Sequence, residues 1–381
     1  PFNARKLGAD MAGLEPAYGK VPLNVVVMQQ DYVRLNQLKR HPRGVLRSMK
    51  VGARTMWAKA TGKNLVGMGR ALIGPLRIGL QRAGVPVELN TAFTDLFVEN
   101  GVVSGVYVRD SHEAESAEPQ LIRARRGAAL DLMDDAWWGP TVPLVGKPWF
   151  ALSERNSPGS IIVNMSGKRF MNESMPYVEA CHHMYGGEHG QGPGPGENIP
   201  AWLVFDQRYR DRYIFAGLQP GQRIPSRWLD SGVIVQADTL AELAGKAGLP
   251  ADELTATVQR FNAFARSGVD EDYHRGESAY DRYYGDPSNK PNPNLGEVGH
   301  PPYYGAKMVP GDLGTKGGIR TDVNGRALRD DGSIIDGLYA AGNVSAPVMG
   351  HTYPGPGGTI GPAMTFGYLA ALHIADQAGK R

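Results

Sequence analysis

Two tyrosines lie beside glycines in this sequence and could take part in acid–base chemistry. Tyr185 precedes a pair of glycines, and Tyr353 lies in the string HTYPGPGG. A phenol can donate a hydrogen bond to a carbonyl oxygen, or act as an acid or base where its surroundings move its pKa from about 10. A tyrosine is more often a packing residue, but the glycine neighbours favour a functional role. We therefore treat Tyr185 and Tyr353 as candidate catalytic residues.

A glycine-rich segment, GHTYPGPGGTIGPAM at residues 350–364, runs into the helical apolar pattern of residues 361–378. The first turn of a helix presents unpaired backbone N–H groups at its positive end, which suits an anion or a group that gains negative charge. Glycines at 355, 357 and 358 would let a planar ligand approach the backbone. A plain loop-to-helix connection is the alternative, but it does not require five glycines in twelve residues.

Other nucleotide and metal signatures are missing or weak. The sequence contains neither a GxGxxG string between a strand and a helix nor a GxxxxGK[ST] string. His182 and His183 are adjacent, and Glu179 does not complete a known metal-ligand spacing with them. Asp134-Asp135 and Asp330-Asp331 are typical of solvated turns. These patterns indicate no metal site.

The elements that must position these residues follow from periodicity and turn signals. Asn100-Gly101 is a preferred two-residue hairpin turn, and alternating apolar residues flank it over Thr94–Asp110. A second Asn-Gly turn, at Asn324-Gly325, lies within a strand-rich segment over residues 315–343. We also expect helices over residues 64–84, 237–248, 251–268 and 361–378, and strands over residues 85–90, 120–126 and 160–174.

Composition bounds the class of protein. The chain has 381 residues with 41% apolar content, enough for two domains, and its 50 Gly and 28 Pro predict many tight turns or close backbone approaches. Cys181 is the one cysteine, which excludes a disulfide framework and favours a buried thiol in a reducing, cytoplasmic compartment. No apolar run is long enough to span a bilayer.

The net charge is only +3, but the first 60 residues carry 11 Lys and Arg against 3 Asp and Glu. In Arg40–Lys63 the cations alternate with apolar side chains, namely Val45, Leu46, Met49, Met56 and Trp57. This pattern is typical of a solvated helix face, and it also fits peripheral contact with an anionic membrane. No helix-turn-helix, zinc-finger or RNP-type signature accompanies the charge, so we expect no nucleic-acid partner.

Two long strings resemble the 3-ketosteroid Δ1-dehydrogenases, and the similarity covers essentially the whole chain. One is GLYAAGNVSAPVMGHTYPGPGGTIGPAMTFGYLAALHIA near the C-terminus, and the other is DDAWWGPTVPLVGKPWFALSERNSPGSIIVNMSGKRFMNESMPYVEACHHMYGGE. The string TKGGIRTD is similar to an element shared with flavoproteins of the fumarate reductase and succinate dehydrogenase group.

The resemblance implies an α/β flavoprotein in which a Rossmann-like FAD-binding domain is interrupted by an α+β catalytic domain of the fumarate reductase type. The FAD-binding domain would comprise residues 1–145 and 313–381, with the catalytic domain over residues 146–312. The implied reaction is 1,2-desaturation of a 3-ketosteroid, with FAD taking hydride from C1 and a tyrosine taking a proton from C2. An external electron acceptor would then reoxidise the flavin.

Residue by residue, the resemblance implies that Tyr185 is the base and that Tyr353 donates to the C3 carbonyl. It also implies that the Gly357 N–H completes the pair of donors, and that Tyr32 supports the base through a hydrogen bond. The residues implied to meet the flavin are Gly342, Asn343, Gly358, Thr359 and Ile360.

The sequence departs from the family pattern at two places. It begins after the family's N-terminal nucleotide loop, and an internal segment is missing near residues 127 and 128. Two rival interpretations follow: a related flavoenzyme that desaturates C4–C5, and a fragment that binds sterol without catalysis.

Overall fold

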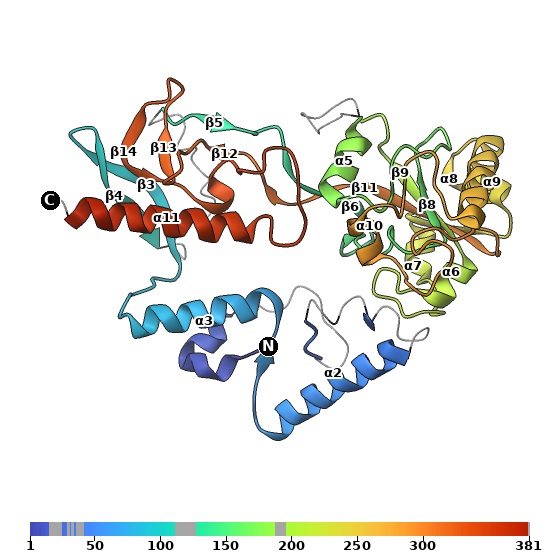
Figure 1. Ribbon diagram of the computed structural model, residues 1–381, viewed down its shortest axis with the longest axis horizontal. Coiled ribbons are helices and arrows are strands. Elements are labelled where there is room, and N and C mark those ends of the chain that lie inside the picture. The colour runs from blue at the N-terminus through green and yellow to red at the C-terminus, as the bar shows by residue number, and fades with distance from the viewer. Residues whose placement is uncertain are drawn as a thin grey trace.

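The computed structural model describes residues 1–14, 25–28, 31, 34–35, 42–110, 127–186 and 196–379. Figure 1 shows these residues in three parts, with an N-terminal part at the bottom. A part containing the C-terminal helix lies at the left, and a sheet-and-helix domain lies at the right. The strand predicted at residues 120–126 and most of the glycine-rich loop after Tyr185 lie outside the described residues.

The N-terminal part carries the basic segment. Its elements are β1 (Phe2–Asn3), η1 (Ala4–Gly13), α2 (Pro42–Ala60), β2 (Leu65–Val66) and α3 (Met68–Arg82). The buried carboxylate of Asp31 pairs with Arg47 Nε at 2.6 Å and Arg54 Nη2 at 2.8 Å, which fixes the inner side of α2. No helix among the described residues is long and apolar enough to cross a membrane.

The predicted hairpin is confirmed, whereas the predicted strand before it is wrong. Strands β3 (Thr91–Glu99) and β4 (Val102–Asp110) pair antiparallel, and Asn100 and Gly101 both have positive φ, as a type I′ turn requires. The segment Val85–Asn90 forms no strand. Its Val85, Val87 and Leu89 side chains are exposed, so the apolar run has no surface to pack against.

The part at the left of Figure 1 is assembled from chain before and after the right-hand domain. Here β5 (Leu130–Asp131) pairs with β12 (Gly318–Ile319), and Ala128 bridges to Arg329. The remaining elements are β13 (Arg326–Leu328), β14 (Ile334–Tyr339), η4 (Gly342–Val344) and α11 (Ile360–Gly379). Among the described residues, parallel pairing is limited to the bridge between Ile319 and Ser345. These residues therefore contain only a small part of the parallel sheet expected of a Rossmann-like domain.

The right-hand domain is built on a six-stranded antiparallel sheet of order β7-β6-β11-β9-β8, with β10 paired to β11. One core packs on each face of the sheet, around Phe205 and Phe215 on one side and around Leu254 and Phe261 on the other. The strands are β6 (Ala136–Val142), β7 (Trp149–Phe150), β8 (Ser160–Val163), β9 (Ala201–Asp206), β10 (Ile234–Ala237) and β11 (Tyr303–Thr315). The helices are α5 (Tyr177–Tyr185), α6 (Gln207–Arg212), α7 (Ser226–Asp230), α8 (Leu240–Ala247), α9 (Ala251–Ser267) and α10 (Ala279–Tyr284).

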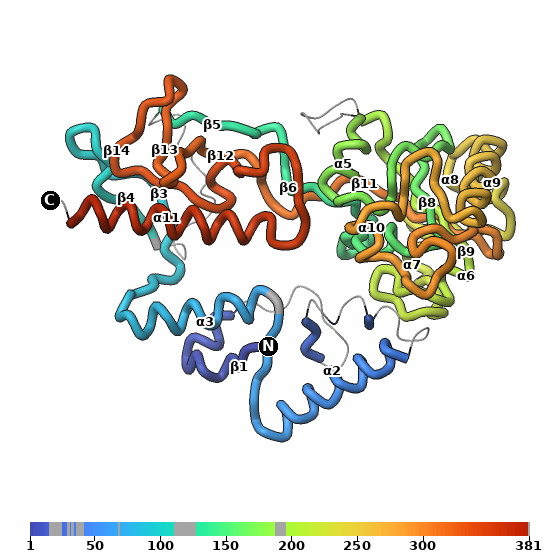
Figure 2. The backbone as a smooth tube through the Cα atoms, in the orientation of Figure 1, coloured from blue at the N-terminus to red at the C-terminus, as the bar shows by residue number. Residues whose placement is uncertain are grey.

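Three predicted helices are confirmed as α8, α9 and α11, and the fourth, over residues 64–84, is confirmed as α3. Gly248 and Gly268 adopt the left-handed conformation directly after α8 and α9, as helix-ending glycines do. Two strands, β6 and β11, run from the sheet toward the left-hand part, as the tube in Figure 2 shows. The chain therefore passes between the two parts at 131–136 and at 312–318.

Candidate active site

The glycine-rich loop before α11 adopts backbone conformations that glycine favours. Gly355 has φ +123° and Gly357 has φ +99°, where a side chain would be strained. The Gly358 N–H donates to Gly355 O at 3.0 Å, and the Gly361 N–H donates to Gly357 O at 2.8 Å. Within the described chain no hydrogen bond uses the Gly357 N–H, and a Cβ placed on Gly357 would meet nothing within 4 Å. This amide is therefore a free donor among the described residues, on an exposed glycine.

Tyr353 lies in the same loop with its ring buried. The ring contacts Trp137 at a centroid distance of 5.7 Å and Tyr177 at 4.6 Å. Its backbone N–H donates to Glu179 Oε1 at 2.8 Å, which ties the loop to α5. Burial and a hydrogen bond to Tyr353 raise the pKa of Tyr177, so the Tyr177 hydroxyl keeps its proton. The two hydroxyls share one hydrogen bond, so one of their two O–H protons remains to donate to another acceptor.

Tyr185 is the last residue of α5, and Gly186 ends the helix with φ +82°. Its ring packs on Trp138 at a centroid distance of 5.0 Å. Burial raises the pKa of Tyr185, with smaller contributions from Cys181 and Asp312. The interpretation of Tyr185 as a base includes a lowered pKa supported by Tyr32, but Tyr32 lies outside the described residues. The described surroundings of Tyr185 alone favour the neutral phenol.

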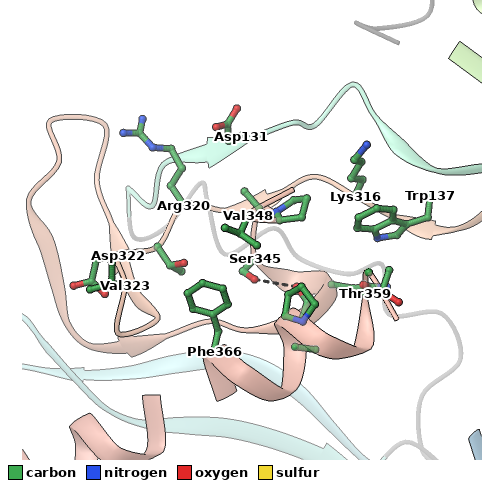
Figure 3. Close-up of a pocket in the computed structure, with 18 residues that line it drawn as sticks. Asp131, Trp137, Lys316, Arg320, Asp322, Val323, Ser345, Val348, Thr359 and Phe366 are labelled. Carbon is green, nitrogen blue, oxygen red and sulfur yellow. Dashed lines mark hydrogen bonds between the residues drawn. The ribbon is translucent and has the colours of Figure 1, made fainter. Parts of the chain in front are cut away.

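A cavity of about 310 Å³ lies between α11, η4 and the strands β5 and β12 (Figure 3). Of the five residues predicted to meet a flavin, the four that line it are Gly342, Asn343, Gly358 and Thr359. The fifth, Ile360, is half exposed and is not among the lining residues. Figure 3 shows Lys316 and Trp137 at one end of the cavity, with Arg320 and Asp131 along its upper wall. Four of the five residues thus share one cavity, and their contact with a flavin stays a prediction.

The cavity fits the ring system of a flavin better than the whole dinucleotide. The N-terminus of α11 lies at Thr359, and its positive end suits a planar group that gains negative charge. The charged side chains of the lining balance, since Asp131 and Asp322 line the cavity together with Lys316 and Arg320. Gly342, with φ +75°, brings the backbone of η4 close to the lining residue Ala363. The described residues include no strand, glycine loop and helix that would hold a diphosphate.

One carboxylate contradicts the sequence interpretation. Asp135 is not in a solvated turn but is buried, and its side chain contacts Lys316, His182, His351 and Trp138. Burial would raise the pKa of Asp135, but hydrogen bonds from His182 and Lys316 and the Lys316 charge outweigh it and hold the pKa well below its usual range. Three of these partners, Lys316, His182 and His351, come from distant segments, so adjacent residues gave no signal of them.

The sequence predicts a buried thiol at Cys181, which is confirmed, and no metal site, which stays a prediction. No group of three or more His, Cys, Asp or Glu in the described ranges is arranged to hold a metal ion. His182 is buried and lies 3.2 Å from Asp135, which makes it part of the core rather than a ligand. Cys181 is a buried free thiol, and burial raises its pKa, which is unsuited to a nucleophile.

Comparison with known proteins gives consistent matches. A family described as FAD binding domain matches residues 3–130 and 120–360. The chain is 89% identical to a 3-oxosteroid 1-dehydrogenase of Mycobacterium tuberculosis, over all of this chain and 76% of that protein. It is 73% identical to a protein of the same name from Mycolicibacterium smegmatis, over 99% of this chain and 74% of that one.

Among solved structures, the chain resembles a 3-ketosteroid delta1-dehydrogenase from Sterolibacterium denitrificans in complex with 1,4-androstadiene-3,17-dione. The TM-score is 0.87 at 35% identity, covering 99% of this chain and 76% of that one. The alignment with the M. tuberculosis protein runs over 427 positions, although this chain has 381 residues. The relative therefore has residues within the aligned span that this chain lacks, and their location near residues 127 and 128 stays a prediction.

Proposed function

The chain belongs to the FAD binding domain family and to its 3-oxosteroid 1-dehydrogenases, and from this premise we propose how its own residues carry out the 1,2-desaturation of a 3-ketosteroid. The observation that carries the proposal is the junction of two features. The cavity lined by Gly342, Asn343, Gly358 and Thr359 adjoins the loop that bears Tyr353 and Gly357.

The first step is polarisation of the C3 ketone. A hydrogen on C2 is acidic only if the oxygen of the developing enolate is stabilised. The Tyr353 O–H and the Gly357 N–H are two donors from one loop, and no described residue accepts from the Gly357 N–H. We assign Tyr177 as a donor to the Tyr353 oxygen, with which it shares a hydrogen bond, because donation in a chain polarises the next O–H.

The second step is removal of the C2 proton by Tyr185. The raised pKa of Tyr185 means that the phenolate is a strong base once formed, but it is scarce at neutral pH. A donor beside the phenolate would increase its population, and we assign that role to Tyr32. Trp138 fixes the position of the Tyr185 ring by direct packing.

FAD, when bound, supplies the hydride acceptor for C1. The residues that would hold its ring system are Gly342, Asn343, Gly358 and Thr359, with Ile360 in the first turn of α11 beneath them. Arg320 also lines this cavity. An external electron acceptor is required for a second turnover. The free, buried thiol of Cys181 supports a reducing, cytoplasmic location.

Binding of the cofactor is the direct test of this proposal. Titration of the purified full chain with FAD should shift the flavin absorbance bands. Anaerobic addition of 4-androstene-3,17-dione should then bleach them. Binding of the steroid without retention of FAD would instead support a sterol-binding fragment. A product with a new C4–C5 double bond from a 5α-reduced 3-ketosteroid, and none at C1–C2, would support the alternative desaturation.

We also propose that α2 contacts an anionic membrane surface, where an apolar substrate partitions. Leu46, Met49 and Met56 follow one another at helical spacing, and each is more than 60% exposed. Trp57 is exposed beside them with the Lys63 ammonium 3.7 Å above its ring. Exposed apolar side chains flanked by cations bind interfaces that carry negative lipid.

Sedimentation with vesicles tests this contact. The chain should pellet with phosphatidylglycerol vesicles and not with phosphatidylcholine vesicles, and Met56→Glu should abolish pelleting. Val269→Glu is the matched control, because Val269 is an exposed apolar residue just after α9 in the right-hand domain. Equal pelleting of Met56→Glu and the unchanged chain would contradict the contact.

A further inference from the structure

A single buried carboxylate, that of Asp135, joins the two candidate tyrosines. Lys316 Nζ lies 2.7 Å from Asp135 Oδ2, and neither side chain is exposed. His351 Nδ1 lies 3.1 Å from the same oxygen. On the other oxygen, Oδ1, the Trp138 indole N–H donates at 2.8 Å and His182 Nε2 lies at 3.2 Å. Both carboxylate oxygens are thus fully occupied by side chains from separate segments.

Each partner of Asp135 leads to one of the tyrosines. His182 is on α5, which ends at Tyr185, and the Trp138 ring packs on the Tyr185 ring. On the other side, His351 is two residues before Tyr353 in the glycine-rich loop. The carboxylate therefore contacts both segments that carry the proposed base and the proposed ketone donor.

Lys316 and Trp137 complete the connection on the Tyr353 side. Lys316 Nζ donates to His351 O at 2.6 Å, so the ammonium binds the loop as well as the carboxylate. The same ammonium lies 5.1 Å from the centre of the Trp137 ring, and this ring also contacts the Tyr353 ring. In Figure 3, Lys316 and Trp137 lie together at the end of the cavity.

The geometry points to Asp135 as a positioning residue. It holds α5 and the loop of residues 350–358 in a fixed relative position, so that Tyr185 and Tyr353 contact the same steroid ring. This inference rests on the proposed roles of the two tyrosines. In this arrangement, neither Asp135 nor Lys316 touches the reacting carbons. They act through His182, Trp138 and His351, and a misplacement of about 1 Å between base and donor lowers a rate by about 100-fold.

The experiment uses a half-reaction that needs no flavin. In D2O, the full chain without added FAD should exchange the C2 hydrogens of 4-androstene-3,17-dione for deuterium, observed by proton NMR. Turnover with FAD and an artificial electron acceptor is measured in parallel as kcat and KM. All rates are expressed per folded chain from circular dichroism. The unchanged chain is measured first. If it exchanges no C2 hydrogen, both the assigned roles of the two tyrosines and this inference are refuted.

Asp135→Asn keeps the shape of the side chain but removes its charge, leaving Lys316 buried without its counter-ion. We expect C2 exchange and kcat to fall by about 100-fold and KM to change by less than about 3-fold. The double variant Asp135→Asn with Lys316→Met removes the stranded ammonium. It should regain the melting temperature of the parent and keep the low exchange rate.

Asp270→Asn is the control for a purely structural effect. Asp270 forms a buried pair with Arg169 at 2.7 Å, deep in the right-hand domain and with no contact to either tyrosine. This variant should lower the melting temperature while leaving C2 exchange per folded chain unchanged. Recovery of C2 exchange together with stability in the double variant would overturn the positioning role, as would a parental exchange rate in Asp135→Asn.

Discussion

Replacing Tyr353 by Phe removes one oxygen and leaves the surrounding packing in place. The ring contacts with Trp137 and Tyr177 need only carbon atoms, and the bond to Glu179 uses the Tyr353 backbone N–H. The loop should therefore keep its position. What is lost is the hydroxyl donor to the ketone oxygen and the acceptor for the Tyr177 proton.

The two losses have different magnitudes and appear in different assays. Removing one of two oxyanion donors costs about 2.7–4 kcal/mol of transition-state stabilisation, or about 100- to 1,000-fold in kcat. The Tyr177 hydroxyl, left without an acceptor, costs about 1–3 kcal/mol of folding stability. Tyr353→Phe should thus reduce kcat and C2 exchange strongly while remaining folded at 25 °C.

The assay is steady-state turnover of 4-androstene-3,17-dione with FAD and an artificial acceptor, alongside urea denaturation. Tyr209→Phe is the matched control, since it also removes a buried hydroxyl, which donates to Glu154 O at 2.8 Å, but in the core of the right-hand domain. The control should lose about 1 kcal/mol of stability and no turnover. A kcat for Tyr353→Phe within about threefold of the unchanged chain would refute the assigned donor.

Three further predictions concern single residues. Tyr185→Phe should abolish C2 exchange. Because the base must be ionised and the pKa of Tyr185 is raised, kcat/KM of the unchanged chain should rise with pH through the alkaline range, whereas residual activity of the variant stays flat. A rising profile in the variant would exclude Tyr185 as the base. Gly357→Ala at φ +99° should cost about 1–3 kcal/mol of backbone strain and shift the donor N–H, lowering kcat with the cavity intact; unchanged kcat would show that this amide is not used. Burial would raise the pKa values of Glu173 and Asp270, but Arg169 and Arg275 outweigh it and lower both. The stability that these two carboxylates contribute is therefore present above pH 4.5 and lost on further acidification. A urea midpoint that stays constant down to pH 3 would contradict this.

Local rules predicted the elements whose structure depends on neighbouring residues. The Asn100-Gly101 turn, the helix ends at Gly248 and Gly268, and the helix after the glycine-rich loop all follow from backbone preferences within a few residues. The strand predicted at Val85–Asn90 failed because a strand needs a partner, and its apolar side chains found none among the described residues.

The site was predicted where glycines mark it and missed where distant charges assemble it. Gly342, Asn343, Gly358 and Thr359 line one cavity, and the contact with a flavin that the resemblance implies for them stays a prediction. Asp135 was interpreted as solvated because its partners are remote, with His351 lying 216 residues away. The contact of Tyr177 with Tyr353 arises in the same way, since it depends on packing of α5 against a loop far along the chain.

The position of the new double bond tests the central claim most directly. The full chain, FAD and an artificial acceptor are incubated with a 3-ketosteroid that carries deuterium at both C1 and C2, and the product is analysed by mass spectrometry and NMR. The account predicts a C1–C2 double bond with loss of one hydrogen isotope from each of these carbons. Retention of all label at C1 and C2 by a chain that has bound FAD would contradict it.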